Sequence, residues 1–177
     1  MKQKIKRLIN FFYYRYLIFI DPSIFAKRIG VKVTGRLFIY GADTGMFGSE
    51  PWLITMGDNV HIVGGTRFIN HDGGVLILRN KYPTLEITKT IVIGDNVYIG
   101  LNSIIMPGVK IGNNVIIGAG SIVNKNIPDD SVFAGVPAKY IKSIDDYLKK
   151  AKYESLEIGH LGSIEKEIML KKIFNVE

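Results

Sequence analysis

Residues 93–128 read IGDNVY-IGLNSI-IMPGVK-IGNNVI-IGAGSI-VNKNIP when they are set in a frame of six. Every hexapeptide begins with Ile or Val, and four of the six have Gly in the second place. The fifth place holds Val, Ser or Ile, which are small or β-branched. A period of six fits neither an α-helix nor an alternating strand. It is typical of short parallel strands that are joined by tight turns and stacked into a β-solenoid.

The physical basis of this prediction is burial along one axis. We expect each leading aliphatic side chain to point into the solenoid and to stack on its counterpart in the next coil. The Gly beside it would let the backbone bend at the corner without a Cβ clash. Three hexapeptides make one triangular coil, so residues 93–110 form one coil and residues 111–128 the next, ~4.8 Å away. The predicted fold is therefore mainly β.

The repeat also predicts how the chain is organised. An earlier patch of repeat covers residues 56–68, after which the frame slips until Ile93. We place an excursion loop at about residues 72–86, because loops that leave a repetitive scaffold often build its functional site. Helical patterns flank the repeat. The predicted parts are a helical segment at 1–30, a solenoid domain at 31–142 and a helical extension at 143–177.

Composition limits the partners. At 177 residues the chain is long enough for one domain with its own core. A net charge of +7 and a pI near 9.5 favour anionic partners such as a phosphorylated cofactor, an anionic membrane or a sugar nucleotide. The basic residues are scattered and form no aromatic–basic recognition motif, so nucleic acid is not expected. The absence of cysteine argues for a reducing compartment.

The N-terminus combines basic and aromatic residues. Four basic residues precede an apolar run from Leu8 to Ile20, which Asn10 and Arg15 interrupt. The run is shorter than the ~20 residues that span a bilayer, and no small-x-small cleavage site follows it. Two interpretations stay open for residues 1–20. They form either a helix packed on the solenoid or a neighbouring subunit, or an interfacial membrane anchor.

His71 stands out among the three histidines. His61 occupies the sixth position of a repeat, next to a turn, and His160 lies in the C-terminal extension. His71 is placed where the repeat gives way to the excursion loop, with Asp72 beside it. A neutral imidazole at the mouth of a cleft can act as a general base. A zinc hydrase would need three convergent imidazoles, which this spacing does not supply, so no metal site is predicted.

Three segments carry a family resemblance. They are Ile-Gly-Asp-Asn-Val at 93–97, Ile-Gly-Ala-Gly-Ser-Ile-Val at 117–123 and Ala-Gly-Val-Pro-Ala-Lys at 134–139. With them, residues 31–142 resemble the hexapeptide-repeat acyltransferases, and are similar to the maltose, galactoside and xenobiotic acetyltransferases. Phe-Gly-Ser-Glu-Pro at 47–51 and Asn-His-Asp-Gly-Gly at 70–74 resemble the branch that O-acetylates capsular polysaccharides and exopolysaccharides.

The resemblance implies a left-handed parallel β-helix, a homotrimer and acetyl-CoA bound in a groove between neighbouring helices. His71 would take the proton from an acceptor hydroxyl as its oxygen attacks the thioester directly, while a backbone N–H holds the oxyanion. Asn70, Asp72 and Glu50 are expected to contact the acceptor. Asp72 and Glu50 are also candidates for orienting His71, and the alternation of side chains in an extended segment favours a partner that is distant in sequence.

The expected acetyl-CoA contacts lie on the last coils. Small residues would allow the pantetheine arm to approach the backbone, and basic residues would face the phosphates. The residues implied for the cofactor are Gly100, Gly118, Ala119, Lys125, Gly135, Pro137 and Lys139.

The sequence is therefore expected to encode an acetyl-CoA-dependent O-acetyltransferase that acts on a sugar hydroxyl in surface polysaccharide biosynthesis. Its expected location is the cytoplasm, with the inner face of the membrane as a possible site of contact. Three alternatives stay open: an N-acyltransferase of a nucleotide-linked amino sugar, a xenobiotic acetyltransferase, and a solenoid scaffold without catalytic activity.

Overall fold

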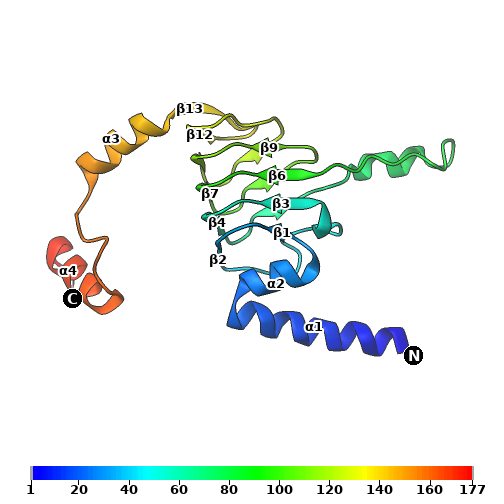
Figure 1. Ribbon diagram of the computed structural model, residues 1–177, viewed down its shortest axis with the longest axis horizontal. Helices are drawn as coiled ribbons and strands as arrows, with labels where there is room; N and C mark the ends of the chain where they lie inside the picture. Colours follow the sequence, from blue (N-terminus) through cyan, green and yellow to red (C-terminus); the bar gives the residue numbers. More distant parts are fainter. Residues whose placement is uncertain (1, 177) are drawn as a thin grey trace. The chain divides into compact units, whose positions relative to one another are not determined.

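The computed structural model describes residues 2–176 of the chain, with side chains from Leu8 onward. The chain divides into two compact units, Met1–Ile144 and Asp145–Glu177. The first unit contains two N-terminal helices, α1 (Lys2–Ile20) and α2 (Pro22–Ile29), and a stack of coils built from short strands (Figure 1). The second unit contains most of α3 (Ile144–Glu154) and all of α4 (Ser163–Phe174), neither of which has a buried residue.

The coils form a triangular prism with three sheets of parallel strands, which we call faces A, B and C. Face A contains β1 (Lys32–Val33), β3 (Ile54–Met56), β6 (Ile91–Ile93) and β9 (Lys110–Ile111). Face B contains β2 (Leu37–Tyr40), β4 (Val60–Val63), β7 (Val97–Ile99), β10 (Val115–Ile117) and β12 (Ser131–Ala134), and β13 (Lys139–Ser143) closes it in antiparallel pairing with β12. Face C contains β5 (Arg67–Phe68), β8 (Ile104–Ile105) and β11 (Ile122–Val123).

The register shows that one coil is three hexapeptides. Val97 pairs with Val115, and the equivalent turn residues Asp95 and Asn113 are 18 positions apart. The preceding coil is longer, because the equivalent residues Asp58 and Asp95 are 37 positions apart. The additional residues leave the prism between β5 and β6 as the excursion loop, which projects from the coils in Figure 1.

Two rows of side chains fill the axis of the prism. The leading residues of the six hexapeptides are at most 2% exposed: Ile93, Ile99, Ile105, Ile111, Ile117 and Val123. The fifth residues are also buried: Val97, Ser103, Val109, Val115, Ser121 and Ile127. The two buried serines donate to backbone carbonyls of their own turns, so their hydroxyls are satisfied. The predicted solenoid core is confirmed.

The role predicted for the repeated glycines was wrong in detail. The left-handed residues of the turns are mainly asparagines, among them Asn96 (φ 54°) and Asn114 (φ 54°), which tolerate this conformation. A Cβ on Gly100 would lie 2.5 Å from the backbone nitrogen of Ala119 in the next coil. In the second place of the hexapeptide glycine is therefore required because neighbouring coils approach closely. The bend is made two places later, by Asn96, Asn102 and Asn114 or by Gly108 and Gly120.

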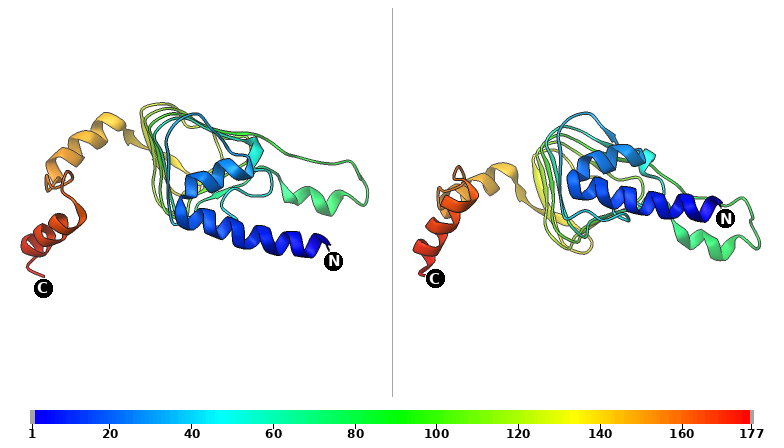
Figure 2. Two further views of the ribbon diagram at one scale, coloured as in Figure 1. Left: turned by 60° about the horizontal axis from the view of Figure 1, so that its bottom comes forward. Right: turned by 90° about the horizontal axis from the view of Figure 1, so that it is seen from below.

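The N-terminal helices lie across the first end of the prism (Figure 2). Asp21 caps α2 by accepting from the Ser23 backbone N–H at 2.8 Å, and Phe25 of α2 is buried in the core. On α1, Leu17 is buried and the partly buried Tyr14 and Ile18 pack against the same core. Within residues 2–176, no helix is long and apolar enough to cross a membrane.

Candidate active site

The excursion loop is tied at its root by backbone hydrogen bonds. The Asp72 N–H donates to the Ile87 carbonyl at 2.9 Å, and the Lys89 N–H donates to the Asn70 carbonyl at 2.7 Å. The Asp72 carboxylate accepts from Gly74 N–H at 2.9 Å and caps the short 3₁₀ helix η2 (Gly73–Leu78). These bonds fix the backbone of His71, which lies between the last residues of face C and the loop.

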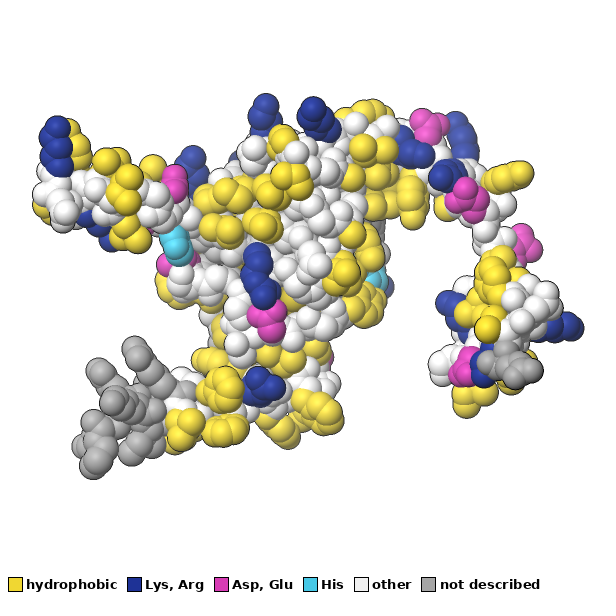
Figure 3. Space-filling view, turned by 180° about the vertical axis from the view of Figure 1, so that it is seen from behind, with side chains coloured by type: hydrophobic (Ala, Val, Ile, Leu, Met, Phe, Trp, Pro, Cys, Tyr) yellow, Lys and Arg dark blue, Asp and Glu magenta, His cyan; other side chains and the backbone are white. Residues whose placement is uncertain are grey.

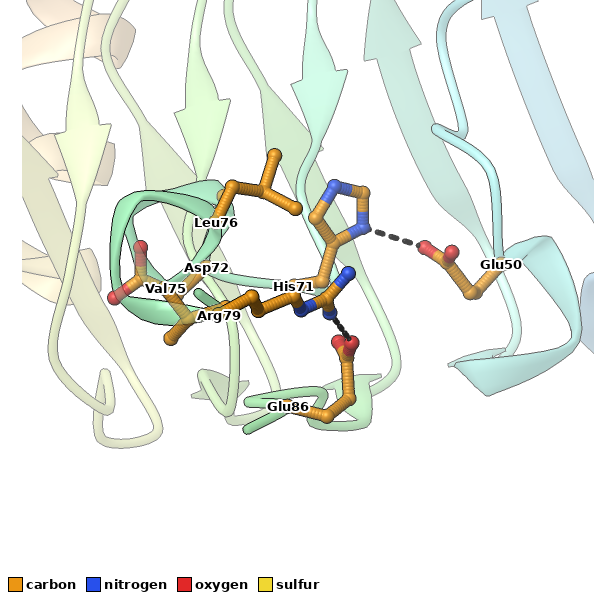
Figure 4. A pocket seen from close by; sticks show the side chains of 8 residues that line it. Glu50, His71, Asp72, Val75, Leu76, Arg79 and Glu86 are labelled. Atoms are coloured by element: carbon orange, nitrogen blue, oxygen red, sulfur yellow. Dashed lines mark hydrogen bonds and ion pairs between the residues drawn. The ribbon is translucent and has the colours of Figure 1, made fainter. Parts of the chain in front are cut away.

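The imidazole of His71 pairs with Glu50. Its Nδ1 is 2.8 Å from Oε2 of Glu50 (Figure 4). A neutral ring that donates from Nδ1 keeps the lone pair on Nε2, which is the arrangement that a general base needs. Of the two partners considered for His71, the structure therefore selects Glu50, whereas Asp72 caps η2.

Glu50 is held in place by the core. The segment before it contains Phe47, which is fully buried and stacks on Phe68 with ring centroids 5.4 Å apart. After it, Pro51 is also buried and begins the 3₁₀ helix η1 (Pro51–Leu53). The carboxylate is thus carried by a short segment that is anchored on both sides.

His71 lines two clefts. The first has a volume of about 200 Å³ and is formed mainly by the loop, with Glu50, Asp72, Val75, Leu76, Arg79 and Glu86 around it. The second has a volume of about 420 Å³ and lies along the coils, with Ile69, Ile87, Lys89, Met106, Pro107 and Asn124 around it. The imidazole is therefore accessible from two clefts, each of which is lined by both polar and apolar side chains.

Arg79 and Glu86 form an ion pair in the first cleft. The Arg79 Nε also donates to the Leu85 carbonyl at 3.0 Å. The hydrogen bond from Thr88, with the positive charge of Arg79, lowers the pKa of Glu86 below its usual value. Sequence reasoning missed both cleft residues. Their only signal was that they are charged residues within the predicted loop, Arg79 at its middle and Glu86 at its end.

Asn70 does not occupy the substrate-binding position that was expected. It is 1% exposed, and its side-chain amide donates to the Lys89 carbonyl at 3.2 Å. Because neighbouring side chains of an extended segment point to opposite sides, the outward position of His71 turns Asn70 inward. Asn70 therefore holds the root of the loop and does not line either cleft.

The residues expected to bind acetyl-CoA fall on two corners of the prism. Gly118 and Ala119 follow β10 at the corner between faces B and C, whereas Lys125 follows β11 at the corner between faces C and A. His71 follows β5 and shares the second corner. Gly135, Pro137 and Lys139 are exposed beyond β12. Gly100 is buried beneath Ala119, so the expectation that it contacts the cofactor was wrong.

The other histidines are placed apart from this site. His61 lies on face B, where its Nδ1 is 3.0 Å from the Tyr40 hydroxyl and its ring stacks on Phe38. His160 lies in the second unit. In the part of the chain that the structure describes, no group of three or more His, Cys, Asp or Glu side chains could hold a metal ion.

Comparison with known proteins agrees with the repeat and the fold. Residues 90–125 match the family model for the bacterial transferase hexapeptide (six repeats). Protein CapG of Staphylococcus aureus is 49% identical over 142 residues, covering 75% of this chain and 83% of CapG. The chain belongs to the hexapeptide-repeat transferases. Like its relatives in that family, it has the left-handed β-helix fold that was expected.

Other members of the hexapeptide-repeat transferases identify the class of enzyme. The galactoside O-acetyltransferase of Escherichia coli K12 is 39% identical over 117 residues, covering 60% of this chain and about half (54%) of the relative. The solved maltose O-acetyltransferase of Clostridium difficile 630 has a TM-score of 0.51 and 28% identity, covering 68% of this chain and 73% of that structure. The chain is an acyltransferase.

Proposed function

We propose that this enzyme transfers an acetyl group from acetyl-CoA to a hydroxyl of a sugar in surface polysaccharide biosynthesis. The observation that carries the proposal is the His71–Glu50 pair, with Nε2 of His71 left free between two clefts. The cytoplasm is the proposed location, because acetyl-CoA is made there.

The chemistry follows from this pair. Nε2 of His71 accepts the proton of the acceptor hydroxyl while its oxygen bonds to the thioester carbonyl carbon. Glu50 stabilises the imidazolium that forms, as the buried aspartate does in a Ser-His-Asp triad. Collapse of the tetrahedral intermediate breaks the carbon–sulfur bond, and the imidazolium returns the proton to the departing thiolate. No acyl-enzyme is formed.

The two clefts suit the two substrates. The larger cleft offers apolar contact from Ile87 and Met106 for the pantetheine arm, and Lys89 supplies a positive charge for the phosphates of acetyl-CoA. Serine acetyltransferase from Brucella abortus, solved in complex with coenzyme A, supports this co-substrate; it has a TM-score of 0.50 and 26% identity, covering 64% of this chain and 40% of that structure. The smaller cleft offers Arg79, Glu86 and Asp72 as hydrogen-bonding groups for sugar hydroxyls.

The sugar acceptor has separate support. The E. coli relative is named a galactoside O-acetyltransferase. In addition, the segments that supply Glu50 and His71, residues 47–51 and 70–74, are those that resemble polysaccharide O-acetyltransferases. Hydroxyl acetylation is therefore favoured over the N-acyl and xenobiotic alternatives.

The test is a thiol-release assay with acetyl-CoA and a panel of acceptors. Neutral glycosides, nucleotide-linked amino sugars and small aromatic drugs would be compared, and each product would be analysed by mass spectrometry after mild alkali. We expect turnover with glycosides and an alkali-labile ester in the product. An alkali-stable amide would contradict O-acetylation, and the absence of thiol release with every acceptor would favour a scaffold.

We also propose a homotrimer in which two subunits complete each site. When face C of a triangular prism is turned toward a three-fold axis, its two flanking corners meet two different neighbours. One of these corners carries His71 and Lys125, and the other carries Gly118 and Ala119. The outward residues Ile104 and Ile122 of face C would supply apolar contact.

Light scattering coupled to size exclusion would measure this assembly. We expect the mass of three chains at micromolar concentration. Apolar contact between the C faces should keep the mass nearly independent of salt. A stable monomer under these conditions would contradict the shared site.

A further inference from the structure

The surface of α1 that faces away from the core is mainly apolar over residues 8–20, where Arg15 is the one charged side chain and lies over the Phe11 ring. The helix turns Tyr14, Leu17 and Ile18 toward the core. The rest of its surface carries eight exposed apolar side chains, which we call the exposed α1 face: Leu8, Ile9, Phe11, Phe12, Tyr13, Tyr16, Phe19 and Ile20. Phe12 is 63% exposed and Phe19 is 89% exposed. Figure 3 shows hydrophobic side chains along this helix at the end of the molecule.

The exposed α1 face has the character of a binding surface. Single exposed apolar residues are common on proteins, but contiguous patches mark interaction sites. Phe12 and Phe19 lie seven positions apart and Tyr16 lies between them, so they form one stripe along the helix. The neighbouring Ile24 of α2 is also exposed and extends the patch.

Charge indicates what the occupant is. Residues 1–20 contain five Lys or Arg and no Asp or Glu. The side chains of Lys2, Lys4, Lys6 and Arg7 lie outside the described residues, but their sequence positions place them in the first turns of α1. Parallel packing of α1 against a second α1 would bring the basic first turns together, and antiparallel packing would leave those charges without an anionic partner. An anionic bilayer offers both negative headgroups and an apolar layer beneath them.

The orientation of α1 also fits a bilayer. The helix lies across the end of the coil stack in both views of Figure 2 and below the first coils in Figure 1. A helix lying flat in a membrane would therefore set the solenoid axis upright on it.

We propose that α1 binds the surface of an anionic membrane, with the exposed α1 face in the acyl boundary and the basic residues against the headgroups. His71 follows the second coil from this end, so its clefts would lie about two coil spacings, roughly 10 Å, from the end of the prism that α1 covers. This places the site within reach of a lipid-linked glycan acceptor, a step that rests on the proposed function. In the proposed trimer, three copies of α1 would face the same membrane surface, so that all three bind it at once.

Vesicle co-sedimentation of the full chain tests the proposal without acetyl-CoA or an acceptor. We expect binding to vesicles of phosphatidylcholine with phosphatidylglycerol, weaker binding to phosphatidylcholine alone, and loss of binding in high salt because the attraction is screened. The double substitution Phe12→Ser/Phe19→Ser should lower the partition coefficient at least about tenfold. Lys4→Gln/Lys6→Gln should lower it roughly 10- to 30-fold on anionic vesicles.

Tyr153→Ser is the matched control, because Tyr153 of α3 is 92% exposed and its loss should leave vesicle binding unchanged. Thiol release with a soluble acceptor should be the same for all these variants, which separates this proposal from the proposed function. The proposal is overturned if the wild type stays in solution with anionic vesicles. It is also overturned if Phe12→Ser/Phe19→Ser alters the oligomeric mass while vesicle binding is retained, since the face would then join copies of the chain.

Discussion

Replacing His71 with alanine is expected to lower the rate constant for acetyl transfer by roughly 10²–10⁴-fold, the range that follows loss of a general base. His71 is half-exposed and lies between the two clefts, so its removal takes away the proton acceptor without opening the core. Steady-state thiol release should show this loss in kcat. The melting temperature should change little.

Glu50→Gln provides the control for this assignment. Glutamine keeps the shape of the side chain but loses the negative charge that stabilises the imidazolium. We expect a loss of up to about 10⁴-fold, because a glutamine amide can also hold the imidazole in the wrong tautomer, as asparagine does in place of the aspartate of a Ser-His-Asp triad. If His71→Ala retained nearly wild-type turnover, another residue would be the base. The proposed role of Glu50 in stabilising the imidazolium would then also be wrong.

Replacing Phe47 with alanine is expected to destabilise the protein by about 3–5 kcal/mol, the usual cost of truncating a buried phenylalanine. Phe47 is fully buried between Phe25, at a centroid distance of 6.4 Å, and Phe68, at 5.4 Å. Denaturant unfolding at one fixed protein concentration would measure the change, because assembly contributes to apparent stability.

Phe47→Ala should also lower the specific activity of the molecules that remain folded. Phe47 anchors the segment that carries Glu50, so the carboxylate would lose its fixed position relative to His71. Trp52→Ala is the comparison, since Trp52 lies in the next turn and is 55% exposed. We expect that variant to stay within about 1 kcal/mol of the wild type. Equal losses from the two substitutions would show that the stack of Phe47 is not what holds this segment.

The sequence alone determined the scaffold and the position of its interruption. A repeat of six places Ile93, Ile99 and Ile105 at equivalent points of successive strands. If one of these side chains points into the axis of the prism, the others must do so too. The break in the frame after Phe68 located the loop for the same reason. His71 could be singled out because it stands at that break. The strands, the break and the position of His71 all follow from the order of residues along the chain, so the period of the sequence predicts them.

Only the tertiary structure decided which residues meet at His71. Glu50 is 21 positions away, and it reaches the imidazole only because Phe47 anchors its segment in the core. Arg79 and Glu86 join the cleft through the path of the loop, which no repeat encodes. Asn70 turned inward because its neighbour turned outward.

The glycines and the cofactor residues show the same division. The spacing of glycine was visible in the sequence, but its cause, the 2.5 Å approach of Ala119 to a Cβ at Gly100, arises between coils. Likewise, Gly118 and Lys125 are close in sequence yet lie on different corners of the prism. A one-dimensional period specifies which side chains face the axis. Contacts between coils, corners and loops depend on how the chain stacks in three dimensions.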